Sequence, residues 1–195
     1  MKMFRESFKE FKDLRAVVVT GLLIALSMVI ESFTINLGFA KINFAFLAIA
    51  AIGMLYGPSV SICAGAICDI LGYLVAPDGA FFPLYTLIGA MQGLIYGVIA
   101  YRKLSKKTGR EFDIEMMIRL VIARVADVVF INLICNTAAN FHYGFLRDKT
   151  LGAAIAARVA KNLLELPIDI ILIVGVLMAV LKAYTVVFGT RRTPA

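Results

Sequence analysis

Asp69 is the single acidic residue in a long apolar segment, and its chemistry suits a ligand contact. The segment reads LYGPSVSICAGAICDILGYLVAP from Leu55 to Pro77. A carboxylate at membrane depth is costly, so it usually faces a cavity, a ligand or an opposite charge. Its two oxygens can accept a pair of hydrogen bonds from adjacent N–H donors of a heterocycle. We therefore expect Asp69 to lie in a polar site within a helix bundle.

Three asparagines recur every fourth residue in a later apolar stretch. Asn132, Asn136 and Asn140 share one face of a helix at this spacing. Each amide carries donors and acceptors, so such a ladder suits a heterocycle with mixed hydrogen-bonding edges. Hydrogen bonds between neighbouring helices explain the same ladder equally well.

The last apolar stretch also carries polar side chains. Arg158, Asn162 and Glu165 share one helical face, and Lys161 is adjacent to it. A guanidinium forms two-point contacts, so Arg158 is the strongest candidate for an anionic or carbonyl part of a ligand. Asn162, or Asn136, is a candidate to complete the polar edge next to Asp69. Alternatively, these charges neutralise one another within the bundle, with Asp69 and Arg158 paired together or with Lys161 and Glu165.

Aromatic and basic residues cluster near the loops on one side of the predicted bundle. Phe81, Phe82 and Tyr85 offer stacking surface. The loops add three cations or titratable bases as secondary contacts, which are Lys41, His142 and Arg147. An aromatic and basic mouth favours a flat, anionic small molecule. No metal-ligand cluster, phosphate-binding loop or pair of catalytic carboxylates is evident, so neither an enzyme nor a cofactor is predicted.

The composition is that of a membrane protein. Hydrophobic residues make up 61% of 195, and charged residues make up 17%, against about 25% in soluble domains. About 20 apolar residues cross a bilayer. The sequence predicts an all-α integral membrane bundle of six transmembrane helices, at roughly Leu14–Phe33, Ile42–Tyr56, Ser59–Ala76, Phe81–Tyr101, Met116–Asn140 and Leu151–Leu181. Pro167 should kink the last of these.

The net charge of +7 reports topology rather than nucleic-acid binding. Six Lys or Arg residues lie between Arg102 and Arg119, and five lie in the first fifteen residues. The positive-inside rule therefore places both termini in the cytoplasm. We expect a single transmembrane domain over 1–195. Residues 1–13 would form an amphipathic cytoplasmic segment in contact with membrane lipid, and 183–195 a cytoplasmic tail.

Two further features bear on packing. Gly21 and Ala25 are four residues apart in the first span, and such small residues let another helix approach closely. That helix belongs either to the same bundle or to a partner subunit. Arg124 and Asp127 are three residues apart and close enough to pair, for which internal charge neutralisation or contact with a partner subunit is the favoured explanation.

The order of these motifs resembles a known family. The short second span ends MLYGP at Pro58, and AGAICDILGYLVAPDGAFFPLYTLIGAMQGLIYG follows from Ala64 to Gly97. The last span carries ARVAKNLLELPIDI, ending at Ile170. Together they resemble the substrate-binding S component of an energy-coupling factor (ECF) vitamin transporter, most closely the folate-specific type.

The resemblance implies a high-affinity folate-binding subunit with no ATPase motif of its own. It implies two kinds of partner, a membrane scaffold (T) subunit and two cytoplasmic ATPase subunits, with Gly21 and Ala25 as the docking stripe. It also implies a bacterial or archaeal plasma membrane. The alternatives are an S component for riboflavin or thiamine, an integral membrane enzyme, which would need a metal or diphosphate motif, and an assembly subunit without a ligand.

Overall fold

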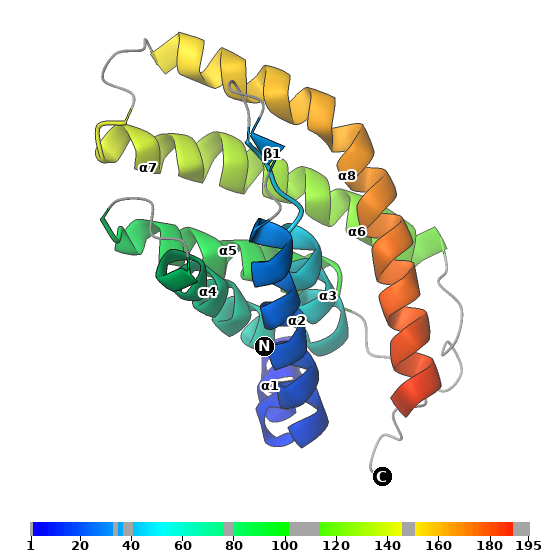
Figure 1. The fold of residues 1–195 in the computed structure, drawn as a ribbon. Coiled ribbons are helices and arrows are strands. Elements are labelled where there is room, and N and C mark those ends of the chain that lie inside the picture. Colours follow the sequence, from blue (N-terminus) through cyan, green and yellow to red (C-terminus); the bar gives the residue numbers. More distant parts are fainter. Residues whose placement is uncertain are drawn as a thin grey trace.

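The computed structural model describes residues 2–32, 35–36, 41–75, 80–101, 114–145 and 151–188, and these are almost entirely helical (Figure 1). The elements in chain order are α1 (Lys2–Lys9), η1 (Glu10–Lys12), α2 (Leu14–Ser32), β1 (Ile35–Asn36), β2 (Lys41–Ile42), α3 (Phe46–Tyr56), α4 (Pro58–Val75), α5 (Pro83–Ile99), α6 (Ile114–Ala126), η2 (Asp127–Cys135), α7 (Asn136–His142) and α8 (Leu151–Phe188).

The six predicted spans correspond to α2, α3, α4, α5, the continuous helix α6–η2–α7, and α8, so the predicted all-α membrane bundle is confirmed. By length and composition, three of these helices can cross a membrane: α2, α4 and the part of α8 from Ile155 to Phe188. α3 and α5 are shorter apolar helices. Figure 1 shows α6–η2–α7 running between α5 and the first half of α8.

Two helix boundaries differ from the sequence prediction. α3 begins at Phe46 rather than Ile42, because Ile35–Asn36 and Lys41–Ile42 pair as an antiparallel hairpin. α8 runs to Phe188, past the predicted end at Leu181, and so includes the first residues of the expected tail. Residues 189–195 lie outside the described part of the chain. Pro167 lies inside α8, which changes direction along its length in Figure 1.

The N-terminal helix α1 is part of the fold. Ser7 is fully buried, and its Oγ accepts hydrogen bonds from the backbone N–H groups of Ser59 (2.9 Å) and Val60 (3.3 Å). The same hydroxyl donates to the backbone oxygen of Tyr56 at 2.7 Å. The first N–H groups of a helix have no partner within the helix, so Ser7 caps α4 from another segment.

Glycines allow α3, α4 and α5 to pack closely. Gly57 has φ +81°, a left-handed conformation, and it makes the turn after which α4 starts at Pro58. A Cβ on Gly93 would lie 2.0 Å from the backbone oxygen of Ser61. Gly89 and Gly97, four residues to either side of Gly93, are likewise close to α4, so this small-residue face of α5 is an internal packing surface against α4.

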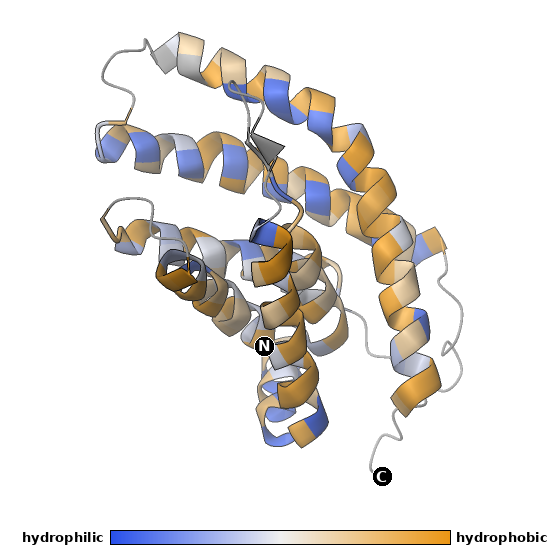
Figure 2. Ribbon diagram, in the orientation of Figure 1, coloured by the Kyte–Doolittle hydropathy of each residue, from blue (hydrophilic) through white to orange (hydrophobic). Residues whose placement is uncertain are grey.

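Apolar side chains cover the outside of the bundle as well as its core. The core includes the fully buried Ile52, Leu120 and Leu177. Leu22 on α2 and Ile171 on α8 are 65% and 72% exposed. Apolar outer faces suit a lipid environment. Figure 2 shows hydrophilic residues concentrated along α6–η2–α7 and the first half of α8.

Candidate functional site

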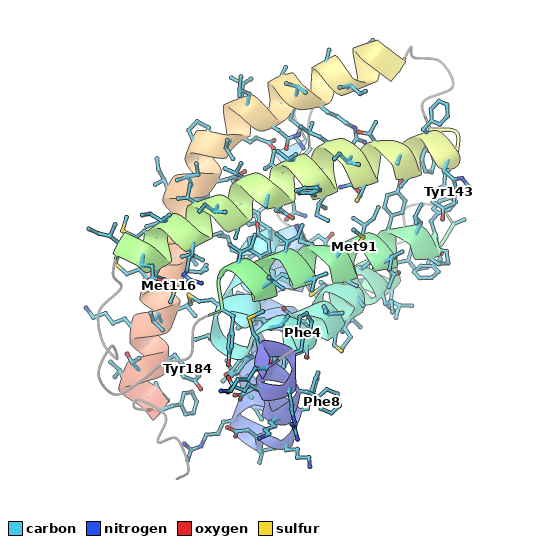
Figure 3. The ribbon with its side chains drawn as sticks, turned by 180° about the vertical axis from the view of Figure 1, so that it is seen from behind. Phe4, Phe8, Met91, Met116, Tyr143 and Tyr184 are labelled. Carbon is cyan, nitrogen blue, oxygen red and sulfur yellow. The ribbon has the colours of Figure 1, made fainter. Side chains whose placement is uncertain are left out.

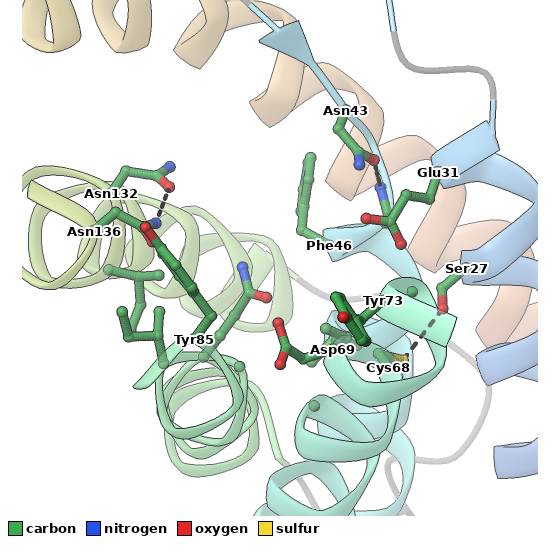
Figure 4. Close-up of a pocket in the computed structure, with 18 of the residues that line it drawn as sticks. Ser27, Glu31, Asn43, Phe46, Cys68, Asp69, Tyr73, Tyr85, Asn132 and Asn136 are labelled. Carbon is green, nitrogen blue, oxygen red and sulfur yellow. Dashed lines mark hydrogen bonds between the residues drawn. The ribbon is translucent and has the colours of Figure 1, made fainter. Parts of the chain in front are cut away.

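A cavity of about 720 Å³ lies among α2, α3, α4, α5, α6, η2, α7 and α8. Its size falls within the range of about 300–1,000 Å³ typical of small-molecule sites. Figure 4 shows Asp69, Tyr73 and Glu31 near one side of the cavity, with Asn132, Asn136 and Tyr85 across from them. Two separate parts of the chain, α2–α5 and the helices after Ile114, thus form the site together.

Asp69 lies in the cavity wall as predicted. Thr86 Oγ1 on α5 donates a hydrogen bond to Asp69 Oδ2 over 2.5 Å. Within the described part of the chain, no donor is recorded for Oδ1. Glu31 on α2 lines the same side of the cavity. The wall formed by α2 and α4 therefore carries two carboxylates, Glu31 and Asp69.

Aromatic rings surround one end of the cavity. Phe82 packs against Tyr143 with ring centroids 4.3 Å apart and lies 5.5 Å from Phe145. Phe81 lies 5.2 Å from Tyr73. The predicted stacking residues Phe81, Phe82 and Tyr85 all line the cavity. Figure 3 shows Tyr143 at the edge of the molecule, away from Phe4 and Phe8 of α1.

The predicted asparagine ladder both lines the cavity and joins helices. Asn136 Nδ2 donates to Asn132 Oδ1 at 3.3 Å, and Asn132 Nδ2 donates to Asn162 Oδ1 on α8 at 3.2 Å. Asn140 Oδ1 accepts a hydrogen bond from Tyr85 at 2.7 Å. Asn132 and Asn136 line the cavity, whereas Asn162 lies behind Asn132 and is not part of the lining. The ladder therefore makes a hydrogen bond between helices, and the ligand contact of Asn132 and Asn136 stays a prediction.

Asn132 belongs to η2, a stretch of π-helix. Segments of π-helix often occur at functional sites. The stretch runs from Asp127 to Cys135 and continues directly into α7. It therefore contributes Asp127 to the buried interior and Asn132 to the cavity.

Arg158 lies one layer behind the cavity. Its Nη1 donates to the backbone oxygen of Asn132 at 3.2 Å, and it is not among the lining residues. Among the described residues, Asp69 and Arg158 do not form an ion pair. Lys161 and Glu165 do line the cavity, and their charged groups lie 3.6 Å apart. Lys161 and Glu165 therefore neutralise each other on α8, and Asp69 takes no part in this pairing.

Of the three predicted contacts at the mouth, the structure describes the side chain of His142 alone. His142 is exposed at the end of α7, with its ring 5.1 Å from that of Tyr143, and it is not part of the cavity lining. Arg147 and the side chain of Lys41 lie outside what the structure describes.

A cluster of buried charged residues centred on Arg124 borders the cavity. Arg124 Nη1 donates to Asp127 Oδ2 at 2.5 Å, which confirms the predicted pairing. Arg124 Nη2 also reaches Asp169 on α8 at 2.6 Å. The guanidinium carbon lies 3.7 Å from the ring centroid of Phe46 on α3. Four elements (α3, α6, η2 and α8) therefore meet at Arg124, which itself contributes to the cavity lining.

Sequence reasoning missed several lining residues. Glu31, Asn43, Tyr73 and Gln92 all contribute to the cavity. Glu31 had a usable signal, because it is an acidic residue in an apolar segment, as Asp69 is. Gln92 had none, since a single amide among apolar residues is compatible with any helix face.

The small-residue stripe of α2 faces away from the bundle. Gly21 and Ala25 are exposed, and a Cβ built on Gly21 meets no atom within 4 Å. Within the described residues this stripe is therefore not an internal packing surface, in contrast to the glycine face of α5.

Comparisons with known proteins agree on one family. Residues 15–185 match the family described as "ECF transporter, substrate-specific component". The folate transporter FolT of Clostridium novyi is 30% identical over 166 residues, covering 84% of this chain and 88% of its own. FolT of Leuconostoc mesenteroides is 31% identical over 159 residues, covering 81% and 82%. A crystal structure of FolT bound with folic acid superposes with a TM-score of 0.66 at 26% identity, covering 93% and 99%.

Proposed function

The chain belongs to the family of ECF transporter substrate-specific components, and from this premise we propose that it is the high-affinity folate-binding membrane subunit of an ECF-type vitamin uptake transporter. A protein of this family is a multi-pass membrane component that binds a substrate for transport, and it is not an enzyme. Folate is the ligand named for the similar FolT proteins and for the FolT crystal structure.

The position of Asp69 is the observation that carries the proposal. A pterin has an N–H group in its ring and an amino group beside it, and a carboxylate accepts both hydrogen bonds. Thr86 occupies one oxygen of Asp69 and so orients the carboxylate toward the cavity. Phe81, Phe82 and Tyr85 offer stacking surface for the flat rings.

The charges around the cavity favour one direction for the ligand. Glu31 and Asp69 line the side wall, so the donor-rich pterin is favoured there and the anionic glutamate tail is not. The tail then points to the outer mouth, where we propose Lys41, His142 and Arg147 as its contacts. Arg158 supports the site indirectly, by holding the backbone of Asn132.

The outward stripe on α2 supports a docking role. We propose that Gly21 and Ala25 meet the membrane scaffold subunit, which assembles with two cytoplasmic ATPase subunits. The exposed, smooth surface at Gly21 permits close approach of a partner helix.

We also propose a bacterial or archaeal plasma membrane location with both termini in the cytoplasm. Residues 1–13 and 183–195 would then lie on that side, and the exposed Phe4 and Phe8 of α1 would contact membrane lipid. A cysteine introduced between residues 102 and 113, in a cysteine-free background, should react with an impermeant reagent only from the cytoplasm. Labelling from outside would refute this topology.

Calorimetry on the purified full chain tests the ligand assignment. Folic acid, riboflavin and thiamine are titrated under the same conditions. We expect tight binding of folic acid and no tight binding of riboflavin or thiamine. Tight binding of riboflavin or thiamine with no response to folic acid would keep the family and overturn the vitamin.

A further inference from the structure

The side-chain amide of Gln92 lies in the cavity wall, and a buried residue outside the cavity lining sets its orientation. It lies on α5, lines the cavity and is partly exposed. Its Nε2 donates a hydrogen bond to Asp127 Oδ1 at 3.1 Å. Among the described residues, no donor is recorded for its Oε1.

Asp127 fixes the direction of that hydrogen bond, with Gln92 as the donor. It is fully buried, and its Oδ2 accepts from Tyr96 at 3.2 Å and from Arg124 at 2.5 Å. A carboxylate paired with a guanidinium acts as an acceptor only. The NH₂ end of Gln92 must therefore face Asp127, and its carboxamide oxygen is left for the cavity.

Asn132 and Asn136 also line the cavity, but they are held differently from Gln92. Asn132 uses both ends of its side chain, because its oxygen accepts from Asn136 and its nitrogen donates to Asn162. Asn136 has an oxygen that no described donor satisfies, as Gln92 has, but its nitrogen is held by another amide and not by a buried carboxylate.

We propose that Gln92 is a specificity-determining residue, whose oxygen shares with Asp69 the hydrogen bond donated by the ring N–H group of a heterocyclic ligand. Asp127 is the positioning residue that keeps this oxygen turned toward the ligand. The proposal rests on the proposed function, in which the heterocycle is the pterin of folate. A fixed amide favours one donor–acceptor pattern on the ligand and disfavours the inverted pattern.

Folic acid and aminopterin form a suitable pair of probes. Aminopterin carries an amino group in place of the carbonyl oxygen on the pterin ring of folic acid, and the neighbouring ring nitrogen changes from donor to acceptor. The parent chain should therefore bind the two with different dissociation constants, measured by calorimetry on the full chain. The ratio of these constants is the readout, because a general loss of stability does not select between the ligands.

Gln92→Leu tests the contact. It should weaken folic acid binding about three- to tenfold, the effect of one neutral hydrogen bond, and bring the ratio closer to one. Met91→Leu is the matched control, since Met91 is the preceding residue, is 37% exposed and does not line the cavity. Unchanged affinity and ratio in Gln92→Leu would overturn the proposal.

Asp127→Asn tests the positioning role. An asparagine can donate as well as accept, so the Gln92 amide is free to turn over, and the ratio should move toward one. Reduced thermal stability with an unchanged ratio would leave Asp127 purely structural and overturn this part. If Asp127→Asn does not fold, Gln92→Leu alone decides. If the parent chain ignores both probes, the proposed function fails; if it binds them and neither variant alters the ratio, only this inference fails.

Discussion

Thr86 on α5 donates a hydrogen bond to Asp69 on α4, with 2.5 Å between Thr86 Oγ1 and Asp69 Oδ2. This bond joins two helices across the cavity wall and fixes one carboxylate oxygen. The second oxygen remains available to a ligand. Thr86 therefore holds the Asp69 carboxylate, a group that is costly to place in a membrane, in one orientation.

Asp69→Asn should weaken folic acid binding by about ten- to a hundredfold, because a charge-assisted hydrogen bond contributes about 1.5–3 kcal/mol. Calorimetry on the purified variant gives the dissociation constant. Ile70→Ala is the control, as Ile70 is adjacent on α4 but 41% exposed and absent from the cavity lining. Parent-like affinity in Asp69→Asn would exclude this carboxylate as a ligand contact.

Ala25→Trp should abolish folate uptake by cells that supply the partner subunits, while calorimetry on the isolated chain shows unchanged affinity. A bulky ring on the exposed stripe blocks the approach of another helix but does not touch the cavity. Leu26→Trp is the control, because Leu26 is also exposed, at 49%, but faces another direction on α2. Loss of ligand binding in Ala25→Trp would make the stripe part of the bundle's own packing.

Gly93→Ala should lower the free energy of unfolding by about 1–3 kcal/mol or more. The new Cβ would lie 2.0 Å from the backbone oxygen of Ser61, so α4 and α5 must move apart. Thermal unfolding in detergent measures the change. Gly175→Ala on α8 is the control, because a Cβ there meets nothing within 4 Å. Equal melting temperatures for the two variants would contradict the close packing of α4 on α5.

Asp169→Leu should destabilise the fold by about 3–5 kcal/mol, the usual cost of breaking a buried ion pair. Arg124 would lose its ion-pair partner on α8 and keep Asp127 as its ion-pair partner among the described residues. Thermal unfolding again gives the measurement, with Ile168→Val as the control because Ile168 is 53% exposed. An unaltered melting temperature would show that the link between α6 and α8 contributes nothing to stability.

The lengths of the apolar segments predict most of the helices of the fold. Some contacts between side chains depend instead on how those helices pack. Asp69 and Asn132 are polar residues within apolar helices, Phe82 directly precedes α5, and all three line the cavity. The placement of Arg158 behind Asn132 depends on how α8 rotates against η2, and helical periodicity does not fix that rotation.

The missed residues show a second limit. No local pattern indicates the role of Asp169, because its partner Arg124 is 45 positions away in the sequence. Ser7 likewise caps a helix that begins some fifty residues later. Local patterns describe each helix, whereas such long-range pairs appear only when the helices are packed.

A site-specific fluorescence titration tests the central claim, that folate binds in this cavity, most directly. The chain contains no tryptophan, so Phe82→Trp places a single reporter in the cavity wall and Phe8→Trp places one on α1, where Phe8 is 64% exposed. Folic acid should quench Phe82→Trp saturably, with the dissociation constant found by calorimetry, and should give no saturable change in Phe8→Trp. Calorimetric binding of folic acid to Phe82→Trp without any saturable quenching would place the ligand elsewhere and contradict the account.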